Sequence, residues 1–427
     1  MKILIEQSGH HLNNMGDVAM LQIAVTRLQK LWNNVEIHII TTDPELLAKY
    51  CPNTHPFLPS GRNIWSFKYG SRNPFLNKII NYFYKLGLDQ KLRRRSPHLM
   101  KWLLEFILRK DQKFLEEFQS FNKILFSADL VMATGGGYIN DVFLDNANGV
   151  INTLELGIAL HKKTAIVGVG LGPLKDADTI KRAKAVFPYV DVISLREKRA
   201  SVPLLHSFGV TSQKYITTGD DAIELVYQSR TENLGNGIGV NLRISNYSNL
   251  NMEVVIAVKN ALHKAVATYS SSLVPVPISR HLDPNGLEDP DSVAIQQLIE
   301  GYTDQPDGGW SLDSPTKVIK NAGLCRLVVT ASYHAAVFAL SQGVPVVGLA
   351  KSEYYVDKFV GLADQFGVGV QVVFLNDGNI EETLFARICH LWEQSESLRP
   401  QLLNMAKQQI ELGHAAYQRI YDLTGNK

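Results

Sequence analysis

Short runs of β-branched and aliphatic residues alternate with amphipathic stretches along most of the chain, and this alternation constrains the fold more than any other feature. In the first half, strands are predicted at 2–7, 35–42, 128–134, 164–170, 191–196 and 214–219. In the second half, they are predicted at 238–244, 273–278, 326–331, 345–350 and 368–375. Helical spacing follows at 17–32, 334–342, 379–395 and 400–422. Strands separated by helices form parallel sheets covered on both faces, so the sequence predicts an α/β fold.

A polar segment divides the predicted strands into two groups. Residues 228–237 carry few apolar side chains and are typical of a linker. We therefore predict one domain over 1–230 and a second over 231–427. Whether the last helix returns to the first domain is left open by the sequence.

The composition is that of a folded protein without strongly charged macromolecular partners. Hydrophobic residues make up 45% of the 427 residues, and 43 Lys and Arg against 41 Asp and Glu leave a net charge of +2. Such a balance argues against a nucleic-acid partner. The three cysteines form no CxxC pair, so we expect neither disulfides nor a thiolate metal site, and we expect a cytoplasmic location. No apolar run is long enough to predict a membrane-spanning helix.

One region breaks the alternation. Residues 60–125 show no strand pattern, and the span 62–123 holds 14 Lys and Arg against 5 Asp and Glu, together with several aromatic residues. Basic residues among aromatics are typical of a helix that lies on an anionic membrane, at the inner face for a cytoplasmic protein. The alternative is an inserted helical pair with a solvated basic face.

Three glycine-rich loops follow predicted strands of the first domain, at 7–17, 133–141 and 168–173. The carboxyl ends of parallel strands are where α/β proteins bind ligands. We therefore predict that Asn14, Gly16, Asp17, Gly136 and Gly137 contact substrate, with Asp17 capping the helix that follows the first loop. The spacing matches neither a dinucleotide-binding fingerprint nor a phosphate-binding P-loop.

Cationic residues also cluster at predicted strand ends. Arg196, Arg243 and Arg280 each follow a strand, and the planar fork of arginine suits carboxylate and phosphate groups. Lys351 and Lys358 follow a later strand and are further candidates for binding an anion.

His334 is the strongest single catalytic candidate. A predicted strand ends near Ala331 and a helix begins near Ser332, which places His334 in the first helical turn, on the cleft side. Histidine is suited to proton transfer near neutral pH. The alternative interpretation is a capping or packing histidine.

Taken together and in order, these motifs resemble the polysaccharide pyruvyl transferase family. The resemblance rests on the Asn14–Asp17 segment, the three glycines before Tyr138, the Gly168–Pro173 loop, Arg196–Glu197 and His334 with Phe338. Ser201, Gly209–Val210, Asp141, Asp220 or Asp221 with Ala222, Ala339, Gly343 and Pro345 also belong to it. Residues 60–125 lie outside the match.

The resemblance implies two Rossmann-like domains that face a cleft, the glycosyltransferase B-type architecture. It also implies transfer of a pyruvyl group from phosphoenolpyruvate to a sugar hydroxyl during surface polysaccharide biosynthesis, with a glycan or lipid-linked sugar as acceptor. In that scheme His334 is the acid or base, and no metal or cofactor is required.

One departure from the family pattern bears on the donor. Family members commonly carry an arginine two residues before the histidine, where this chain has Ser332. Either Arg280, Lys351 or Lys358 takes over its role, or the donor is not phosphoenolpyruvate. The main alternative is a nucleotide-sugar-dependent glycosyltransferase of the same fold, and a third is a non-catalytic glycan-binding member of the family.

Overall fold

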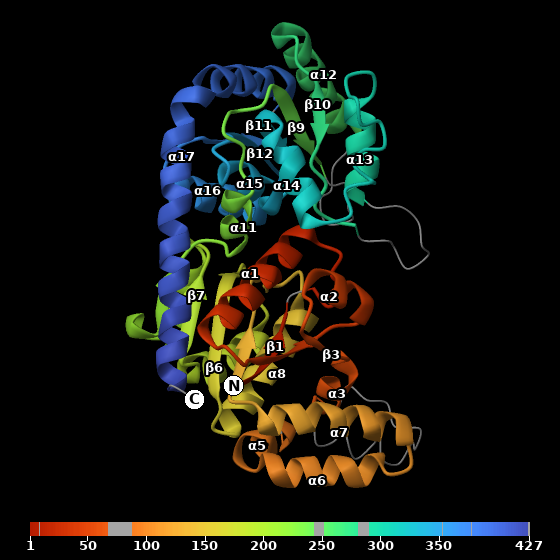
Figure 1. The fold of residues 1–427 in the computed structure, drawn as a ribbon, viewed down its shortest axis with the longest axis vertical. Coiled ribbons are helices and arrows are strands. Elements are labelled where there is room, and N and C mark those ends of the chain that lie inside the picture. The colour runs from red at the N-terminus through yellow and green to blue at the C-terminus, as the bar shows by residue number, and fades with distance from the viewer. Residues whose placement is uncertain are drawn as a thin grey trace.

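The computed structural model describes residues 1–7, 9–66, 88–242, 252–280, 290–351, 353–376 and 378–425. The chain forms two α/β domains stacked along the long axis of the molecule (Figure 1). Each domain is built on a parallel sheet with helices on both faces, which confirms the predicted fold class.

The described part of the first domain contains an eight-stranded sheet in the order β3-β2-β1-β4-β6-β7-β8, and β5 pairs with β6 beside this path. Its strands are β1 (Lys2–Glu6), β2 (Glu36–Ile40), β3 (His55–Phe57), β4 (Leu130–Ala133), β5 (Gly136–Ile139), β6 (Lys163–Leu171), β7 (Val192–Leu195) and β8 (Tyr215–Thr217).

The helices of the first domain connect these strands or extend from them. They are α1 (Met15–Leu31), α2 (Pro44–Tyr50), α3 (Pro59–Ile64), α5 (Leu88–Arg95), α6 (Pro97–Leu108), α7 (Gln112–Ser127), α8 (Leu144–Ala159), α9 (Ala177–Val186), α10 (Ser201–Ser207) and α11 (Ala222–Gln228). Two short 3-10 turns lie at Phe187–Tyr189 and Ser212–Lys214.

The second domain has a five-stranded sheet in the order β10-β9-β11-β12-β13 within the described residues. Its strands are β9 (Gly237–Asn241), β10 (Leu273–Pro275), β11 (Cys325–Thr330), β12 (Val346–Ala350) and β13 (Val370–Phe374). Its helices are α12 (Met252–Tyr269), α13 (Pro290–Ile299), α14 (Pro315–Gly323), α15 (Tyr333–Leu340), α16 (Glu353–Phe366) and α17 (Ile380–Thr424).

Each of the eleven predicted strands is present, and the structure adds two. β3 contains Pro56 and only three residues, so it carries no alternating pattern. β5 lies inside the triple-glycine segment, which we interpreted as a loop, because Gly136 and Ile139 pair with the extended end of β6. The two helices predicted at 379–395 and 400–422 are one helix, α17, that contains Pro400 and bends sharply (Figure 1).

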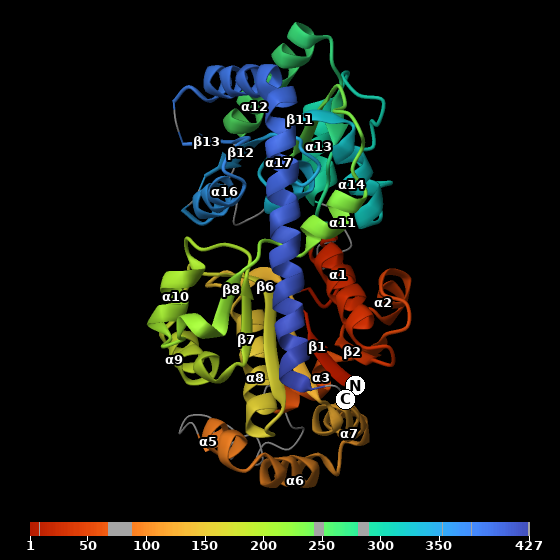
Figure 2. The ribbon, with the colours of Figure 1, turned by 60° about the vertical axis from the view of Figure 1, so that its left-hand side comes forward.

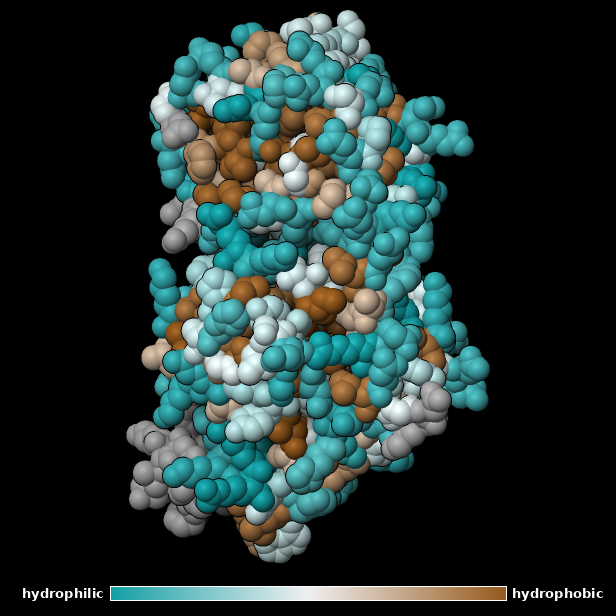
Figure 3. Space-filling model, turned by 90° about the vertical axis from the view of Figure 1, so that its left-hand side faces the viewer, coloured by the Kyte–Doolittle hydropathy of each residue, from teal (hydrophilic) through white to brown (hydrophobic). Residues whose placement is uncertain are grey.

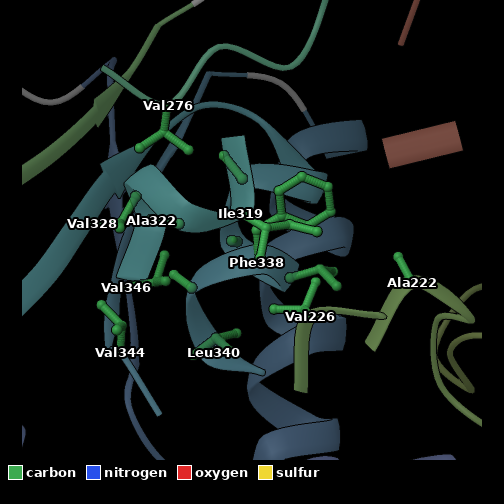
Figure 4. Packing of buried hydrophobic residues seen from close by; sticks show 14 of the residues in the cluster. Ala222, Val226, Val276, Ile319, Ala322, Val328, Phe338, Leu340, Val344 and Val346 are labelled. Atoms are coloured by element: carbon green, nitrogen blue, oxygen red, sulfur yellow. The ribbon is translucent and has the colours of Figure 1, made fainter. Parts of the chain in front are cut away.

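A shared hydrophobic core joins the two domains. Ala222 and Val226 of α11 pack with Phe338 of α15 and with α14, β11 and β12 of the second domain (Figure 4). Met15 of α1 belongs to the same cluster. The contact between the domains is therefore apolar on this side and not a purely solvated cleft.

Helix α17 runs past both sheets (Figure 2). Near its end, the Tyr417 hydroxyl donates a hydrogen bond to Asp221 at 3.0 Å. Arg27 of α1 binds Asp221 at 2.6 Å and Glu224 at 2.8 Å, and its guanidinium lies 4.9 Å from the Tyr417 ring centroid. This buried network fixes the C-terminal half of α17 against α1 and α11.

Residues 88–127 form helices α5, α6 and α7 at the end of the first domain, as expected for an insertion without strands. Part of the predicted basic excess is not at the surface. Arg93 is 1% exposed and binds Glu155 at 2.6 Å, and Arg62 is 5% exposed. No helix in the described part of the chain is long and apolar enough to cross a membrane.

Glu6 at the end of β1 anchors α3 to the sheet. Arg62 lies 3.7 Å from its carboxylate, while His10 and the Thr153 hydroxyl each bind it at 2.7 Å. Burial raises the pKa of Glu6, but Arg62, His10 and Thr153 outweigh that effect and lower it to about 2.

We expect Glu6→Gln to reduce the dependence of stability on acid pH. The pKa in the folded state lies below that in the unfolded chain, so the ionised carboxylate stabilises the fold above about pH 4.5 and this contribution is lost as pH falls toward 2. The wild-type free energy of unfolding should decline over that window by roughly 3 kcal/mol more than that of the variant, as measured by urea denaturation. Glu116→Gln, at an exposed position, is the control. If the free energy of unfolding of Glu6→Gln declined over this window as much as that of the wild type, the low pKa of Glu6 would be contradicted.

Candidate active site

The first glycine loop connects β1 to α1 and contacts the second domain. Asn14, not Asp17, caps α1, because its side-chain oxygen accepts hydrogen bonds from the Gly16 and Asp17 amides at 3.0 and 3.1 Å. The Met15 amide donates to the Ile278 carbonyl, and the Arg280 amide donates to the Asn13 carbonyl, both at 2.8 Å. The predicted cap at Asp17 is therefore wrong, and its carboxylate is left to face the site.

Arg196 explains two of the glycine positions. It follows β7, is 3% exposed, and lies across the second and third glycine loops. A Cβ on Gly137 would lie 2.4 Å from its Nη2, and a Cβ on Gly170 would lie 2.7 Å from its Nε. The absence of side chains at both positions makes room for the guanidinium.

The guanidinium of Arg196 contacts an aromatic ring and a carboxylate in the site. Its Cζ lies 4.0 Å from the centroid of the Tyr333 ring, a cation–π contact worth about 2 kcal/mol when desolvated. Its Nη1 lies 3.5 Å from Asp220 Oδ2. The Gln365 side chain donates to the Arg196 carbonyl, so both domains hold this residue.

His334 lies in the first turn of α15, with Ser332 at the cap position, as predicted. It packs directly on α1 of the other domain, because a Cβ on Gly16 would lie 1.9 Å from its Cγ. The imidazole Nε2 lies 3.6 Å from Asp220 Oδ2 and 4.0 Å from Asp17 Oδ1. His334 is 6% exposed, so this contact is largely shielded from solvent.

Asp220 lies between His334 and Arg196. Burial raises its pKa, but His334, Arg196 and the Ala222 amide, which donates to Oδ1 at 2.9 Å, outweigh that effect and lower it. Asp220 is therefore an ionised carboxylate that lies against the imidazole of His334.

His334, Arg196 and Tyr333 line a cavity of about 150 Å³ between the domains. A smaller cavity of about 30 Å³ shares four residues with it, Gly137, Arg196, Tyr333 and Lys358. The predicted residues that line the larger cavity are Asn14, Asp17, Gly137, Arg196, His334 and Lys358. Lys358 comes from α16, where its Nζ lies 5.6 Å from the Tyr355 ring centroid. A small cavity with two cations and a histidine fits a compact anionic substrate.

The structure does not bring the other predicted residues to the described lining of the cavity. Gly136 lies in β5 and is not among the described lining residues, and Gly16 packs under His334. The Arg280 side chain turns to the Trp310 carbonyl, to which it donates at 3.0 Å. Lys351 is not among the described residues that line the cavity, and Arg243 lies outside the described residues.

Sequence reasoning missed Tyr333 and Tyr355 and left Asp220 out of the site. Asp220 follows β8 in a Thr-Gly-Asp-Asp segment, so its place at a strand end was a usable signal. The tyrosines carry no such signal, because aromatic residues in amphipathic helices are usually core residues. In the described part of the chain, no group of three His, Cys, Asp or Glu side chains is arranged to hold a metal ion.

Comparison with known families finds a match over most of the chain. The family model described as polysaccharide pyruvyl transferase matches residues 14–353, and a search of curated proteins finds no match.

Several solved structures share the fold. A glycosyltransferase from Rickettsia africae is 13% identical, with a TM-score of 0.53 and coverage of 100% of this chain and 99% of that one. HepE from Anabaena, in complex with UDP, is 11% identical, with a TM-score of 0.53 and coverage of 99% of both chains. The UDP-GlcNAc 2-epimerase from Neisseria meningitidis, bound to UDP-GlcNAc, is 14% identical, with a TM-score of 0.50 and coverage of 96% and 99%. At these identities the likeness shows the fold alone, and it confirms the predicted glycosyltransferase B-type architecture.

Proposed function

Because the chain belongs to the polysaccharide pyruvyl transferase family, we propose that it transfers a pyruvyl group from phosphoenolpyruvate to two hydroxyls of a sugar. The product is a cyclic pyruvate ketal, and phosphate is released. The observation that carries this proposal is the buried His334–Asp220 pair beside Arg196 and Lys358, which sets a proton-transfer group next to two cations. The sugar belongs to a glycan or lipid-linked intermediate of a surface polysaccharide, assembled in the cytoplasm.

The reaction needs an acid, a base and anion-binding groups. Protonation of the methylene carbon makes C2 of the enol electrophilic, and one sugar hydroxyl adds there with loss of its proton. Cleavage of the bond between C2 and the phosphate oxygen then releases phosphate, and the second hydroxyl closes the ketal. The two sugar hydroxyls each lose a proton. One of these protons makes up for the proton added to the methylene carbon, and the other is carried away by the released phosphate.

His334 is the residue we assign to proton transfer at the methylene carbon, since it lines the cavity and its Nε2 lies 3.6 Å from Asp220. Asp220 acts as a positioning residue, because it lies against the imidazole of His334 and is not itself among the described residues that line the cavity. Asp17 lines the cavity and is placed to accept a hydrogen bond from a sugar hydroxyl. Asn14 and Gly137 bound the same space.

Family members commonly have an arginine at the position of Ser332, and we assign its anion-binding role to Arg196 and Lys358. Both line the cavities, whereas Arg280 turns away to Trp310. Arg196 supplies the planar fork that suits a carboxylate, and Lys358 supplies a point charge that suits phosphate.

We expect Lys358→Gln to raise the KM for phosphoenolpyruvate about tenfold with a smaller change in kcat, because a lost phosphate contact weakens ground-state binding as well as the transition state. Lys351→Gln is the matched control on the same connection and should change KM by about twofold or less. Steady-state release of inorganic phosphate measures both. A larger effect on KM from Lys351→Gln than from Lys358→Gln would assign phosphate binding to Lys351 instead.

A second candidate is transfer of a sugar from a nucleotide sugar. It is favoured by Ser332 and by the fold shared with the Anabaena protein, whose structure holds UDP. Thermal shift assays separate the two, because a ligand that binds only the folded state raises Tm. We expect phosphoenolpyruvate to raise Tm and UDP to leave it unchanged. A shift with UDP alone, and no release of phosphate with any acceptor tested, would favour the second candidate.

A further inference from the structure

Helix α6 has apolar residues on two faces, only one of which is buried. Met100, Leu104 and Leu108 are at most 3% exposed and pack in the core beneath the first sheet. Leu99, Trp102 and Phe106 are 50%, 59% and 50% exposed. At 100° per residue these three side chains fall within an arc of about 60°, so they form one outer stripe.

The stripe is an ordered surface and not a set of scattered side chains. The rings of Trp102 and Phe106 stack with their centroids 5.9 Å apart, and the Arg109 guanidinium lies 4.1 Å from the Phe106 ring centroid. Helix α6 lies at the end of the molecule farthest from the second domain (Figure 1). Hydrophobic side chains also show at this lower end in the space-filling view (Figure 3).

Positive charges flank the stripe at both ends. Lys91 and Arg95 are exposed before α6, and Arg109, Lys110 and Lys113 are exposed after it. The acidic residue of α6, Glu105, is paired with Lys101 at 3.0 Å. An apolar stripe between exposed cations matches the boundary between acyl chains and anionic headgroups.

A second copy of the chain fits this surface less well. If two stripes paired, in either relative direction, the basic ends of one helix would face basic ends of the other. Like charges at such a distance oppose association, whereas an anionic bilayer neutralises both ends at once.

We propose that the stripe Leu99–Trp102–Phe106, with its flanking Lys and Arg residues, docks this protein peripherally on an anionic lipid bilayer. The helix lies in the plane of the interface, with the stripe among the upper acyl carbons and the cations among the headgroups. The rest of the molecule, including the cavity between the domains, stays in water. This docking is independent of the reaction proposed above, because it needs neither donor nor acceptor.

Sedimentation with vesicles tests the proposal. The probes are phosphatidylcholine vesicles with and without about 30% phosphatidylglycerol, at low salt, without substrate. We expect the wild-type protein to sediment with the anionic vesicles and at least tenfold less with the neutral ones. Trp102→Ser combined with Phe106→Ser should reduce anionic binding by tenfold or more. Arg109→Gln combined with Lys110→Gln should reduce it by about 30-fold, at roughly 1 kcal/mol for each of the two charges.

Matched controls distinguish binding through the stripe from nonspecific binding of the protein to vesicles. Met252→Ser combined with Ile256→Ser removes exposed apolar groups (63% and 51%) from α12 at the other end of the molecule. Arg387→Gln combined with Lys407→Gln removes two exposed cations from α17. Both controls should bind anionic vesicles as the wild type does, and circular dichroism should show that every variant is folded.

Three results would overturn the proposal. One is equal binding to neutral and anionic vesicles, and another is unchanged binding in the stripe variant. The third is a dimer in analytical ultracentrifugation that disappears with Trp102→Ser while vesicle binding is absent, which would make the stripe an interface between copies. Quenching of Trp102 fluorescence by brominated lipid, in a Trp310→Phe background that removes the other exposed tryptophan, supports insertion independently.

Discussion

Replacement of His334 by alanine is expected to lower kcat for phosphate release by about 10³-fold while the affinity for phosphoenolpyruvate changes little. General acid–base catalysis contributes typically about 10²–10⁴-fold, and Arg196 and Lys358 remain in place to hold the donor. Steady-state kinetics give kcat, and calorimetric titration of phosphoenolpyruvate into the variant gives the affinity.

Two further measurements make the His334 assignment specific. His206→Ala is the control, since this histidine is exposed and binds the Tyr215 hydroxyl at 2.9 Å, away from the cavity. In deuterated water, the wild-type enzyme should place one deuterium in the methyl group of the ketal. A His334→Ala variant that keeps more than a tenth of the wild-type kcat would remove His334 from the reaction.

Arg196→Lys is expected to lower kcat/KM by about 10²–10³-fold. Lysine keeps a positive charge near Asp220 but lacks the planar fork and the stacked contact on Tyr333. The substitution therefore removes the binding geometry of the guanidinium and leaves the net charge unchanged. Arg199→Lys is the matched control on the same loop, because Arg199 is exposed and forms a surface pair with Asp357 at 3.3 Å. Its kcat/KM should stay within about twofold.

Gly137→Ala tests whether the placement of the Arg196 guanidinium matters, without changing Arg196 itself. The new Cβ would lie 2.4 Å from Arg196 Nη2 and would displace the guanidinium. We expect a loss of kcat/KM of the same order as for Arg196→Lys, with a folded protein by circular dichroism. Wild-type kinetics in this variant would show that the position of the guanidinium is not required.

The fold was predictable because its strands are buried on both faces and therefore stand out as continuous apolar runs. β3 and β5 were not predictable in this way, since Pro56 and Gly136 give no strand signal and pair only because a neighbouring strand is already in place. The division of α17 at Pro400 was also wrong, because packing of both its ends against the domains keeps the helix continuous through the proline.

The site was partly predictable for a different reason. Strand ends in parallel sheets meet at one edge, so His334 and Arg196 were expected to lie in the cleft. Arg280 carried the same signal, yet its side chain turns to Trp310, because position along a strand does not determine the direction of a long side chain. The contacts of His334 with Gly16 and Asp220 depend on how the two domains dock, and no local pattern encodes that.

The path of α17 also limits how such chains can be recombined. Its first part packs against β11, β12 and β13, and its last turns close the network of Arg27, Asp221 and Tyr417 in the first domain. A chimera cut at residue 230 would pair the last turns of one parent with the first domain of another. A functional exchange of domains must therefore keep the first domain and the end of α17 from the same parent, although they lie at opposite ends of the sequence.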